Sequence, residues 1–275
     1  MNIIYFGYDF FFDCLDALIN EGHTIMHLYT IDCDNVRYNF NTKVIELANK
    51  HGIPVSFSAP TEDNLIRAKE QGCDLLVSAA YGHKIPISDK TPRGINIHPT
   101  LLPEGRGRWP LPWIILKELP ISGITFHVLS PEWDKGNILA QYSFPILPNE
   151  TLVSLNKKIH TTARSHIINI IQNIDTLWEQ AQPQSKGSYW PMPTEHEWTV
   201  DWQAPLITIE KTARAFGPFG WVAEVDNTAW LVQDIDILPQ QHAFPIGSII
   251  ERTDQMMTIA ASDGLVILKK YELDI

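Results

Sequence analysis

The chain has 275 residues, of which 44% are hydrophobic and 19% are charged, a balance typical of a folded protein rather than a disordered one. Its 32 acidic and 21 basic side chains give a net charge of −11, which counts against a nucleic-acid partner because such partners are bound mainly by Lys and Arg. Cys14, Cys33 and Cys73 lack metal-site spacing, so neither a disulfide framework nor a cysteine metal site is expected. No stretch resembles a signal peptide or reaches the about 18 apolar residues of a membrane span, so we expect a cytoplasmic protein.

The first hundred residues alternate apolar runs with amphipathic segments. The predicted strands and helices follow one another at residues 2–7, 10–22, 24–30, 42–52, 53–58, 61–72 and 73–81. Each predicted helix ends at a glycine, and Thr61 is a suitable N-cap. Apolar strands alternating with helices indicate an α/β fold with a doubly wound, mostly parallel, Rossmann-like sheet. Gly7 is followed by phenylalanines instead of further glycines, so a structural turn is favoured there over a nucleotide-binding loop.

The pattern changes in the second half of the chain. A short helix (109–119), two strands (123–130 and 138–146) and a long helix (151–181) complete a predicted first domain, residues 1–182. A linker rich in Pro, Ser and Gly follows at 183–203. The remainder, 204–275, contains one predicted helix and about five short strands, which favours a small OB-like β-barrel.

One short stretch, "INIHPTLLPEGRG" at residues 95–107, places polar side chains where a buried strand ends. Asn96 and His98 lie two apart, so they share one face of the strand. Ligand crevices of open α/β sheets lie at the carboxyl ends of strands. The simpler alternative is a histidine that caps the sheet edge. The added amide and the proline-rich and glycine-rich loop favour a functional site.

A carboxylate suited to act with this pair lies in the turn "SPEWDKGN". Asp134 would orient His98 and favour its charged form if the two side chains met. Asn96 and His98 could then donate hydrogen bonds to a developing oxyanion, while Asp134 moves a proton from an attacking amine. This set of residues is suited to direct acyl transfer without a serine or cysteine nucleophile.

These motifs resemble those of the folate-dependent formyltransferases, which include methionyl-tRNA formyltransferase and glycinamide ribonucleotide transformylase. "NIHPTLLPEGRG" is similar to their N-x-H-x-S-L-L-P element, with Thr100 in place of serine. "GITFHVLSPEWDKGNIL" is similar to their second signature, with Trp133 where an aliphatic residue is usual and Asn137 where Asp is common. Residues 188–225 resemble the linker and the start of the C-terminal domain of the methionyl-tRNA and amino-arabinose enzymes, so the likeness covers nearly the whole chain.

The resemblance implies that 10-formyltetrahydrofolate is the donor co-substrate, without a metal, and that Asn96, His98 and Asp134 are the catalytic residues. In the family the folate is held largely by backbone groups after the fourth strand and by the loop that carries the aspartate. The residues at these positions are Ala80, Tyr81, Gly82, His83, Ile85, Glu132, Trp133 and Asp134. His83 has the alternative role of a solvated loop residue.

The acceptor is predicted to be a small-molecule amine, bound near Arg106, Arg108 and Trp109. The stretches "GRGRWPLPWIIL" and "GSYWPMP" resemble hydroxyornithine transformylases of pyoverdine-type siderophore synthesis, which implies the hydroxylamine nitrogen of N-hydroxyornithine. A sugar-nucleotide amine is an alternative, because the two arginines could bind its diphosphate. The competing interpretation of Arg106 is an ion pair with Glu104 or Glu132.

Two further alternatives remain open. Methionyl-tRNA is disfavoured because the stretch "TIDCDNVRYNFNTKV" (30–44) lacks the basic insertion that the tRNA enzymes carry there. A catalytically silent binding protein on the same fold is disfavoured because all three catalytic residues are present.

Overall fold

The computed structural model describes residues 1–33, 40–217 and 219–273, which form two compact units. The N-terminal unit contains residues 1–110, 121–145 and 157–190. The C-terminal unit contains residues 111–120, 146–156 and 191–275. None of the helices within the described ranges is long and apolar enough to cross a membrane.

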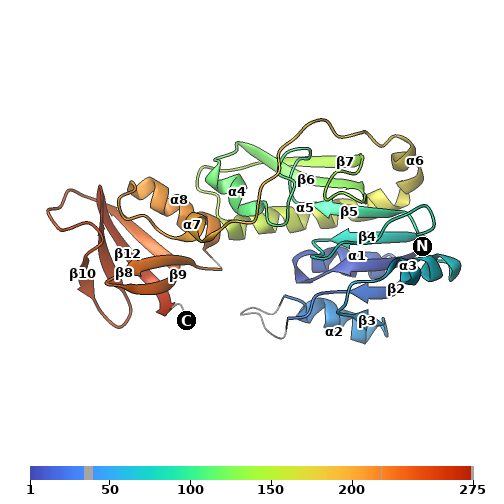
Figure 1. Cartoon of the computed structure of the whole chain (residues 1–275), viewed down its shortest axis with the longest axis horizontal. Coiled ribbons are helices and arrows are strands. Elements are labelled where there is room, and N and C mark those ends of the chain that lie inside the picture. The colour runs from blue at the N-terminus through green and yellow to red at the C-terminus, as the bar shows by residue number, and fades with distance from the viewer. Residues whose placement is uncertain (34–39, 218, 274–275) are drawn as a thin grey trace. The chain divides into compact units, whose positions relative to one another are not determined.

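A seven-stranded mixed sheet forms the centre of the N-terminal unit (Figure 1). Its strands are β1 (Asn2–Gly7), β2 (Thr24–Tyr29), β3 (Val55–Ser56), β4 (Leu75–Ala79), β5 (Gly94–His98), β6 (Ile121–Val128) and β7 (Ile138–Pro145). They lie in the order β3-β2-β1-β4-β5-β6-β7. The pairs from β3 to β5 are parallel, whereas β6 is antiparallel to both β5 and β7. The expected Rossmann-like sheet is therefore present, extended at one side by β6, which runs opposite to the other strands, and by β7.

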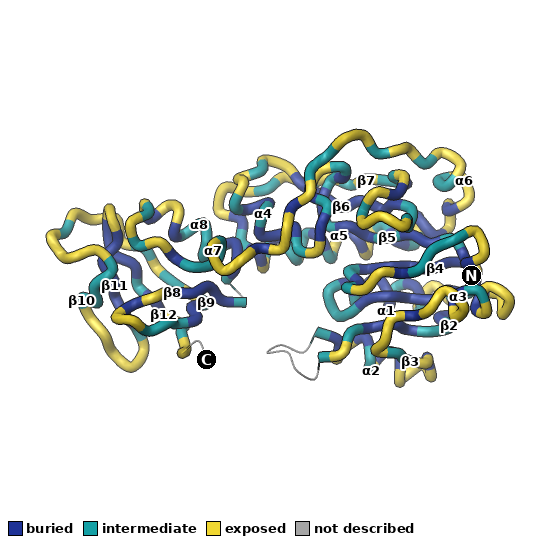
Figure 2. The backbone as a smooth tube through the Cα atoms, in the orientation of Figure 1, coloured by how far each residue is buried: buried dark blue, intermediate teal, exposed yellow. Residues whose placement is uncertain are grey.

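The central strands are buried on both faces, which is why their sequences are continuously apolar. Ile3, Phe6, Leu75 and Ile95 have no exposed surface. The same strands are mostly dark blue in Figure 2. A strand buried in this way cannot leave polar side chains unpaired, so Asn96 and His98 at the end of β5 need partners.

The helices of this unit are η1 (Asp9–Phe11), α1 (Phe12–Asn20), α2 (Thr42–Lys50), α3 (Glu62–Glu70), most of α5 (Leu152–Gln172) and α6 (Ile174–Glu179). The Thr61 hydroxyl caps α3 by accepting from the backbone N–H of Asn64. The single long helix expected over 151–181 is interrupted at Asn173. Its side chain donates to the backbone oxygen of Asn169 at 2.9 Å, one of the local contacts that disfavour a helix interior.

The C-terminal unit contains an antiparallel sheet with the strand order β10-β11-β12-β9-β8. The strands are β8 (Trp221–Val225), β9 (Thr228–Pro239), β10 (Ile249–Arg252), β11 (Met257–Ala261) and β12 (Gly264–Leu273), and the helices are α4 (Leu111–Leu116), α7 (Glu195–Trp198) and α8 (Leu206–Phe216). Helix α8 buries one apolar face, which includes Leu206, Ile209 and Phe216. Five strands were expected and are present, but no closed barrel is found. Within the described residues β8 and β10 are the two edges and do not pair with each other, since the four-residue β10 bonds only to β11.

Candidate active site

The site begins where β5 ends beside the antiparallel strand β6. In this pairing Asn96 lies opposite His127, and His98 lies opposite Thr125. His98 is 4% exposed, and Asn96 is half-buried. Two polar side chains of β5 therefore face the same region as two polar side chains of β6.

Asp134 approaches His98 from the loop between β6 and β7. Its Oδ1 lies 3.4 Å from Nδ1 of His98, and its side chain is only 9% exposed. Oδ2 accepts from the backbone N–H of Gly107 at 3.0 Å. The backbone of Asp134 has φ +55°, a conformation that few non-glycine residues adopt and that concentrates at functional sites. The loop thus holds a carboxylate against one nitrogen of a buried histidine.

The other nitrogen of His98 contacts the loop that follows β5. Nε2 lies 2.8 Å from the backbone oxygen of Gly105. A carbonyl oxygen can only accept, so Nε2 carries a hydrogen. A second hydrogen on Nδ1 would complete an ion pair with Asp134, which is the form suited to donate a proton or a hydrogen bond.

Close backbone contacts hold the Gly105–Gly107 segment in place. Arg106 N–H donates to Ser188 O, and Trp190 N–H donates to Arg106 O at 2.7 Å. Gly107 has φ +129°, and a Cβ there would lie 2.2 Å from the backbone oxygen of Trp190. Only glycine permits this approach, which sets the positions of the Gly105 carbonyl and the Gly107 amide.

His127 belongs to this site, although the sequence pattern did not single it out. Its side chain is buried, with Nδ1 2.9 Å from Val128 O and Nε2 3.0 Å from Nδ2 of Asn96. Oδ1 of Asp134 is 3.8 Å from Nε2. Burial lowers the pKa of His127 to about 4, against the opposing effect of Asp134. The sequence offered one indication of this role, because His127 lies two residues after Thr125 and so shares its face of β6. That face can be assigned to the site only once the pairing of β6 with β5 is known.

The predicted acceptor-side residues have different environments. Arg106 donates from Nε and Nη2 to Oε1 of Gln184, at 3.1 and 2.7 Å, so neither of the expected carboxylates is its partner. Glu104 instead accepts from Ser188, and Glu132 pairs with Lys135. Arg108 is exposed, and its Nη2 lies 3.7 Å from the position of a Cβ on Gly82. Trp109 is half-buried.

The predicted folate-side residues divide into buried and exposed groups. Tyr81 and Ile85 are each 6% exposed and belong to a hydrophobic cluster with Phe6 and Tyr29. Burial raises the pKa of Tyr81 to about 12, and its hydroxyl oxygen has no hydrogen-bond partner among the described residues. Three predicted residues, His83, Glu132 and Trp133, are exposed, whereas Gly82 and Ala80 are half-buried and Ala80 has φ +61°.

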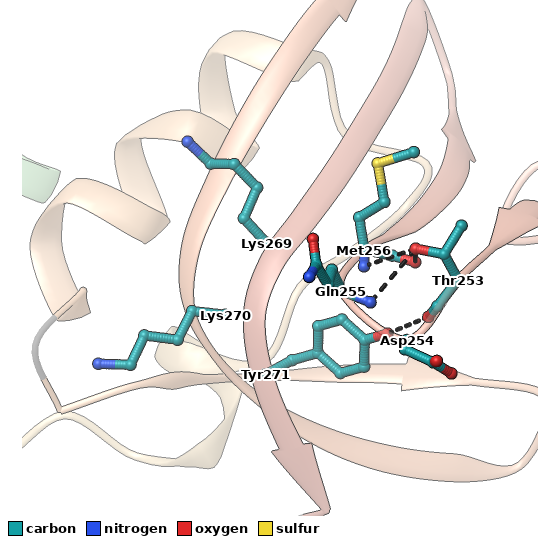
Figure 3. A pocket seen from close by; sticks show the side chains of 7 residues that line it. All are labelled: Thr253, Asp254, Gln255, Met256, Lys269, Lys270 and Tyr271. Carbon is teal, nitrogen blue, oxygen red and sulfur yellow. Dashed lines mark hydrogen bonds between the residues drawn. The ribbon is translucent and has the colours of Figure 1, made fainter.

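A separate cavity of about 730 Å³ belongs to the C-terminal unit (Figure 3). It is lined by the turn Thr253, Asp254, Gln255 and Met256 and by Lys269, Lys270 and Tyr271 of β12. It contains none of the predicted site residues. Asn96, His98 and Asp134 lie outside this cavity. Among the described residues there is no group of three side chains that could bind a metal ion.

Comparison with known protein families identifies the class of enzyme. The formyl transferase model matches residues 7–171, and the formyl transferase C-terminal domain model matches residues 194–274. The chain therefore belongs to the formyl transferase family, as its motifs predicted. It is a folate-dependent formyltransferase, an enzyme that transfers a one-carbon group.

Individual relatives cover almost the whole chain. The methionyl-tRNA formyltransferase of Methylococcus capsulatus is 30% identical over 98% of this chain and 91% of its own. That of Thiobacillus denitrificans is 27% identical over 94% of this chain and 87% of its own.

Solved structures share the fold. An N-formyltransferase of Helicobacter canadensis, in complex with folinic acid and dTDP-3-aminofucose, matches with a TM-score of 0.69 at 17% identity over 98% of this chain and 99% of its own. HypX of Aquifex aeolicus, in complex with tetrahydrofolic acid, matches with a TM-score of 0.71 at 20% identity over 99% of this chain. The chain spans 44% of the longer HypX chain.

Proposed function

We propose that this enzyme transfers the formyl group of 10-formyltetrahydrofolate to the amine of a small molecule. The observation that carries the proposal is the buried contact of 3.4 Å between His98 and Asp134, beside the amide of Asn96. Supporting it are the family membership and the folates bound in the Aquifex and Helicobacter structures.

The proposed reaction is a direct attack on the formyl carbon. The lone pair of the acceptor nitrogen forms the new C–N bond, and the formyl oxygen becomes an oxyanion that accepts from Asn96 and His98. Asp134 takes the proton that the acceptor nitrogen loses. The oxyanion then collapses, the bond from the formyl carbon to N10 of the folate breaks with its electron pair passing to N10, and N10 takes the proton that Asp134 had accepted. Tetrahydrofolate and the formylated amine are released.

The Gly105 carbonyl adds a requirement to this scheme. The Nε2–H of His98 is already donated to Gly105 O at 2.8 Å. A formyl oxygen must therefore share or replace that acceptor before His98 can stabilise an oxyanion. The closely packed Gly105–Gly107 segment thus belongs to the chemistry of the site as well as to its shape.

The proposed folate site lies along Ala80–Ile85 and Glu132–Asp134. The unpartnered Tyr81 hydroxyl fits a site for a polar heterocycle, because a buried donor without a partner is costly. Tyr81 and Ile85 otherwise pack in the core, so we expect their part in folate binding to come mainly from the backbone.

A small acceptor is favoured over tRNA because the chain is acidic and several of its basic side chains are engaged within it. These pairs are Arg93 with Asp175, Arg106 with Gln184, Lys135 with Glu132, Lys211 with Glu118, and Lys269 with Asp236. The net charge of −11 further disfavours a phosphate backbone as the partner. The stretch expected to lack a basic insertion falls partly on residues 34–39, which lie outside the described residues.

N-hydroxyornithine is the preferred acceptor, because a cationic amino acid suits an acidic enzyme and the two motifs quoted above resemble hydroxyornithine transformylases. A sugar-nucleotide amine is the second candidate, and one observation favours it. Arg108 is exposed beside Gly82, where it can reach a phosphate group.

A panel of acceptors tests the proposal. The enzyme is incubated with 10-formyltetrahydrofolate and, separately, with N-hydroxyornithine, dTDP-3-aminofucose or methionyl-tRNA, and tetrahydrofolate is followed by absorbance. We expect turnover with N-hydroxyornithine. Turnover with methionyl-tRNA alone would refute a small acceptor, and folate binding without turnover in a broad amine panel would favour a silent binding protein.

A further inference from the structure

We propose that His127 is a positioning residue that holds the amide of Asn96 with Nδ2, rather than Oδ1, toward the formyl group. The inference rests on the proposed function, since it specifies how Asn96 serves formyl transfer. It starts from contacts that the catalytic scheme does not use, on the strand opposite the one that carries Asn96.

The hydrogen-bond partners of His127 determine which nitrogen carries the hydrogen. Nδ1 lies 2.9 Å from the backbone oxygen of Val128. That oxygen can only accept, so Nδ1 must be the donor. In a neutral ring Nε2 is then an acceptor with a free lone pair.

The surroundings of His127 keep the ring neutral. The residue is 1% exposed, and burial lowers its pKa to about 4. Asp134 opposes this shift, whereas His98 and Arg106 add to it. At neutral pH the ring therefore carries one hydrogen, on Nδ1, and Nε2 remains an acceptor.

An acceptor at Nε2 decides the orientation of the Asn96 amide. The Asn96 nitrogen lies 3.0 Å from Nε2 in a cross-strand pair of β5 and β6. Rotating the amide by half a turn would place Oδ1 against a lone pair, which is repulsive. Nδ2 has two hydrogens, so one bonds to His127 and the other remains to bind the formyl oxygen. His127 thereby selects the donor end of the amide for the oxyanion.

A simpler role for His127 would be to fill the core and satisfy its own polar atoms. Three variants separate the two roles. His127→Leu removes both contacts, His127→Asn retains a donor near the position of Nδ1, and His127→Gln retains an acceptor near the position of Nε2. We expect His127→Leu and His127→Asn to lower kcat at least tenfold with little change in KM for 10-formyltetrahydrofolate, and His127→Gln to recover most of the loss. An equal loss of kcat in all three variants would contradict the inference that His127 acts by positioning Asn96.

A double-mutant cycle with Asn96→Ala provides the sharper test. If His127 acts through Asn96, His127→Leu should have almost no further effect on kcat once Asn96 is alanine. Independent, additive losses would overturn the inference. Thermal unfolding of each variant identifies any that fail to fold, and the Gln variant then supplies the comparison.

A measurement that needs no turnover separates this inference from the proposed function. ¹⁵N NMR of histidine-labelled enzyme at neutral pH should show the His127 ring protonated at Nδ1 and bare at Nε2. Protonation at Nε2 would overturn the inference even if formyl transfer is observed. If no acceptor is turned over, the proposed function fails while the ring spectrum still tests the orientation of Asn96.

Discussion

Oδ1 of Asp134 lies 3.4 Å from Nδ1 of His98, although one residue ends β5 and the other lies in the loop after β6. The contact depends on the left-handed backbone of Asp134 and on the Gly107 amide that binds its second oxygen. Gln184 supports the same loop by donating to the backbone oxygens of Asp134 and Gly136, at 2.8 and 2.7 Å. The carboxylate is thus held in position by the backbone and side chains of the protein itself.

Replacement of this carboxylate should abolish most of the activity without unfolding the enzyme. Asp134→Asn retains the size of the side chain but cannot accept a proton from the acceptor nitrogen, so kcat should fall by about 10²–10⁴-fold. Steady-state kinetics with the acceptor found in the panel measure the effect. Near-normal turnover, with an unchanged pH–rate profile, would show that Asp134 is not the base.

Stability should fall in mild acid because His127 is buried in its neutral form. Its folded pKa is about 4, below the ordinary value of about 6.5, so the unfolded chain binds a proton first as the pH falls. The stabilisation is present above pH 6.5 and is lost progressively down to pH 4, by up to about 3 kcal/mol. Urea unfolding of the wild type and of His127→Gln between pH 4 and 6.5 measures how much of the change in the free energy of unfolding comes from His127. If the free energy of unfolding fell equally with pH in both proteins, His127 would not be the cause.

The two predicted acceptor arginines should respond differently to substitution. Arg106 is bonded to Gln184, so Arg106→Ala should lower the free energy of unfolding by about 2 kcal/mol. Arg108 is exposed, so Arg108→Ala should leave stability unchanged and raise KM for an anionic acceptor. Denaturant unfolding and kinetics on both variants check this contrast. If Arg106→Ala instead left stability unchanged and raised only KM for the acceptor, Arg106 would bind the acceptor and would not act mainly through Gln184.

The close approach at Gly107 should make that position intolerant of a side chain. Gly107→Ala combines a positive φ with a clash against the Trp190 carbonyl and should destabilise by about 3 kcal/mol or more. Gly22→Ala is the matched control, since Gly22 also has a positive φ but no atom lies within 4 Å of its Cβ position. That control should lose about 1 kcal/mol. If thermal or denaturant unfolding showed that Gly107→Ala and Gly22→Ala lose equal stability, the contact with Trp190 would not be the cause.

Much of the site was predictable from the sequence because short-range patterns encode it. Asn96 and His98 lie two apart at the end of an apolar strand, and Asp134 lies in a turn between two strands. These placements follow from side-chain alternation and turn chemistry. The partner of Arg106 was not predictable, because Gln184 reaches it from the region after α6.

The fold shows the same division between local and long-range causes. Alternating strands and helices predicted the parallel part of the sheet, and glycines predicted where helices end. The predicted barrel was not confirmed. Closure of a sheet depends on how its edge strands meet, and the pattern of apolar residues does not specify this. The break at Asn173 lies where its side chain makes two local contacts with Asn169, at 2.9 and 3.0 Å.

From the sequence alone came the class of enzyme, most of the strands and helices around the candidate site, and the prediction that Asn96, His98 and Asp134 act together. Tertiary structure alone decided how these groups are oriented. Pairing of β5 with β6 sets His127 against Asn96, and the Gly105–Gly107 segment places a carbonyl on His98 and an amide on Asp134. Such contacts join segments whose spacing follows no local period, so they exist only once the backbone has folded.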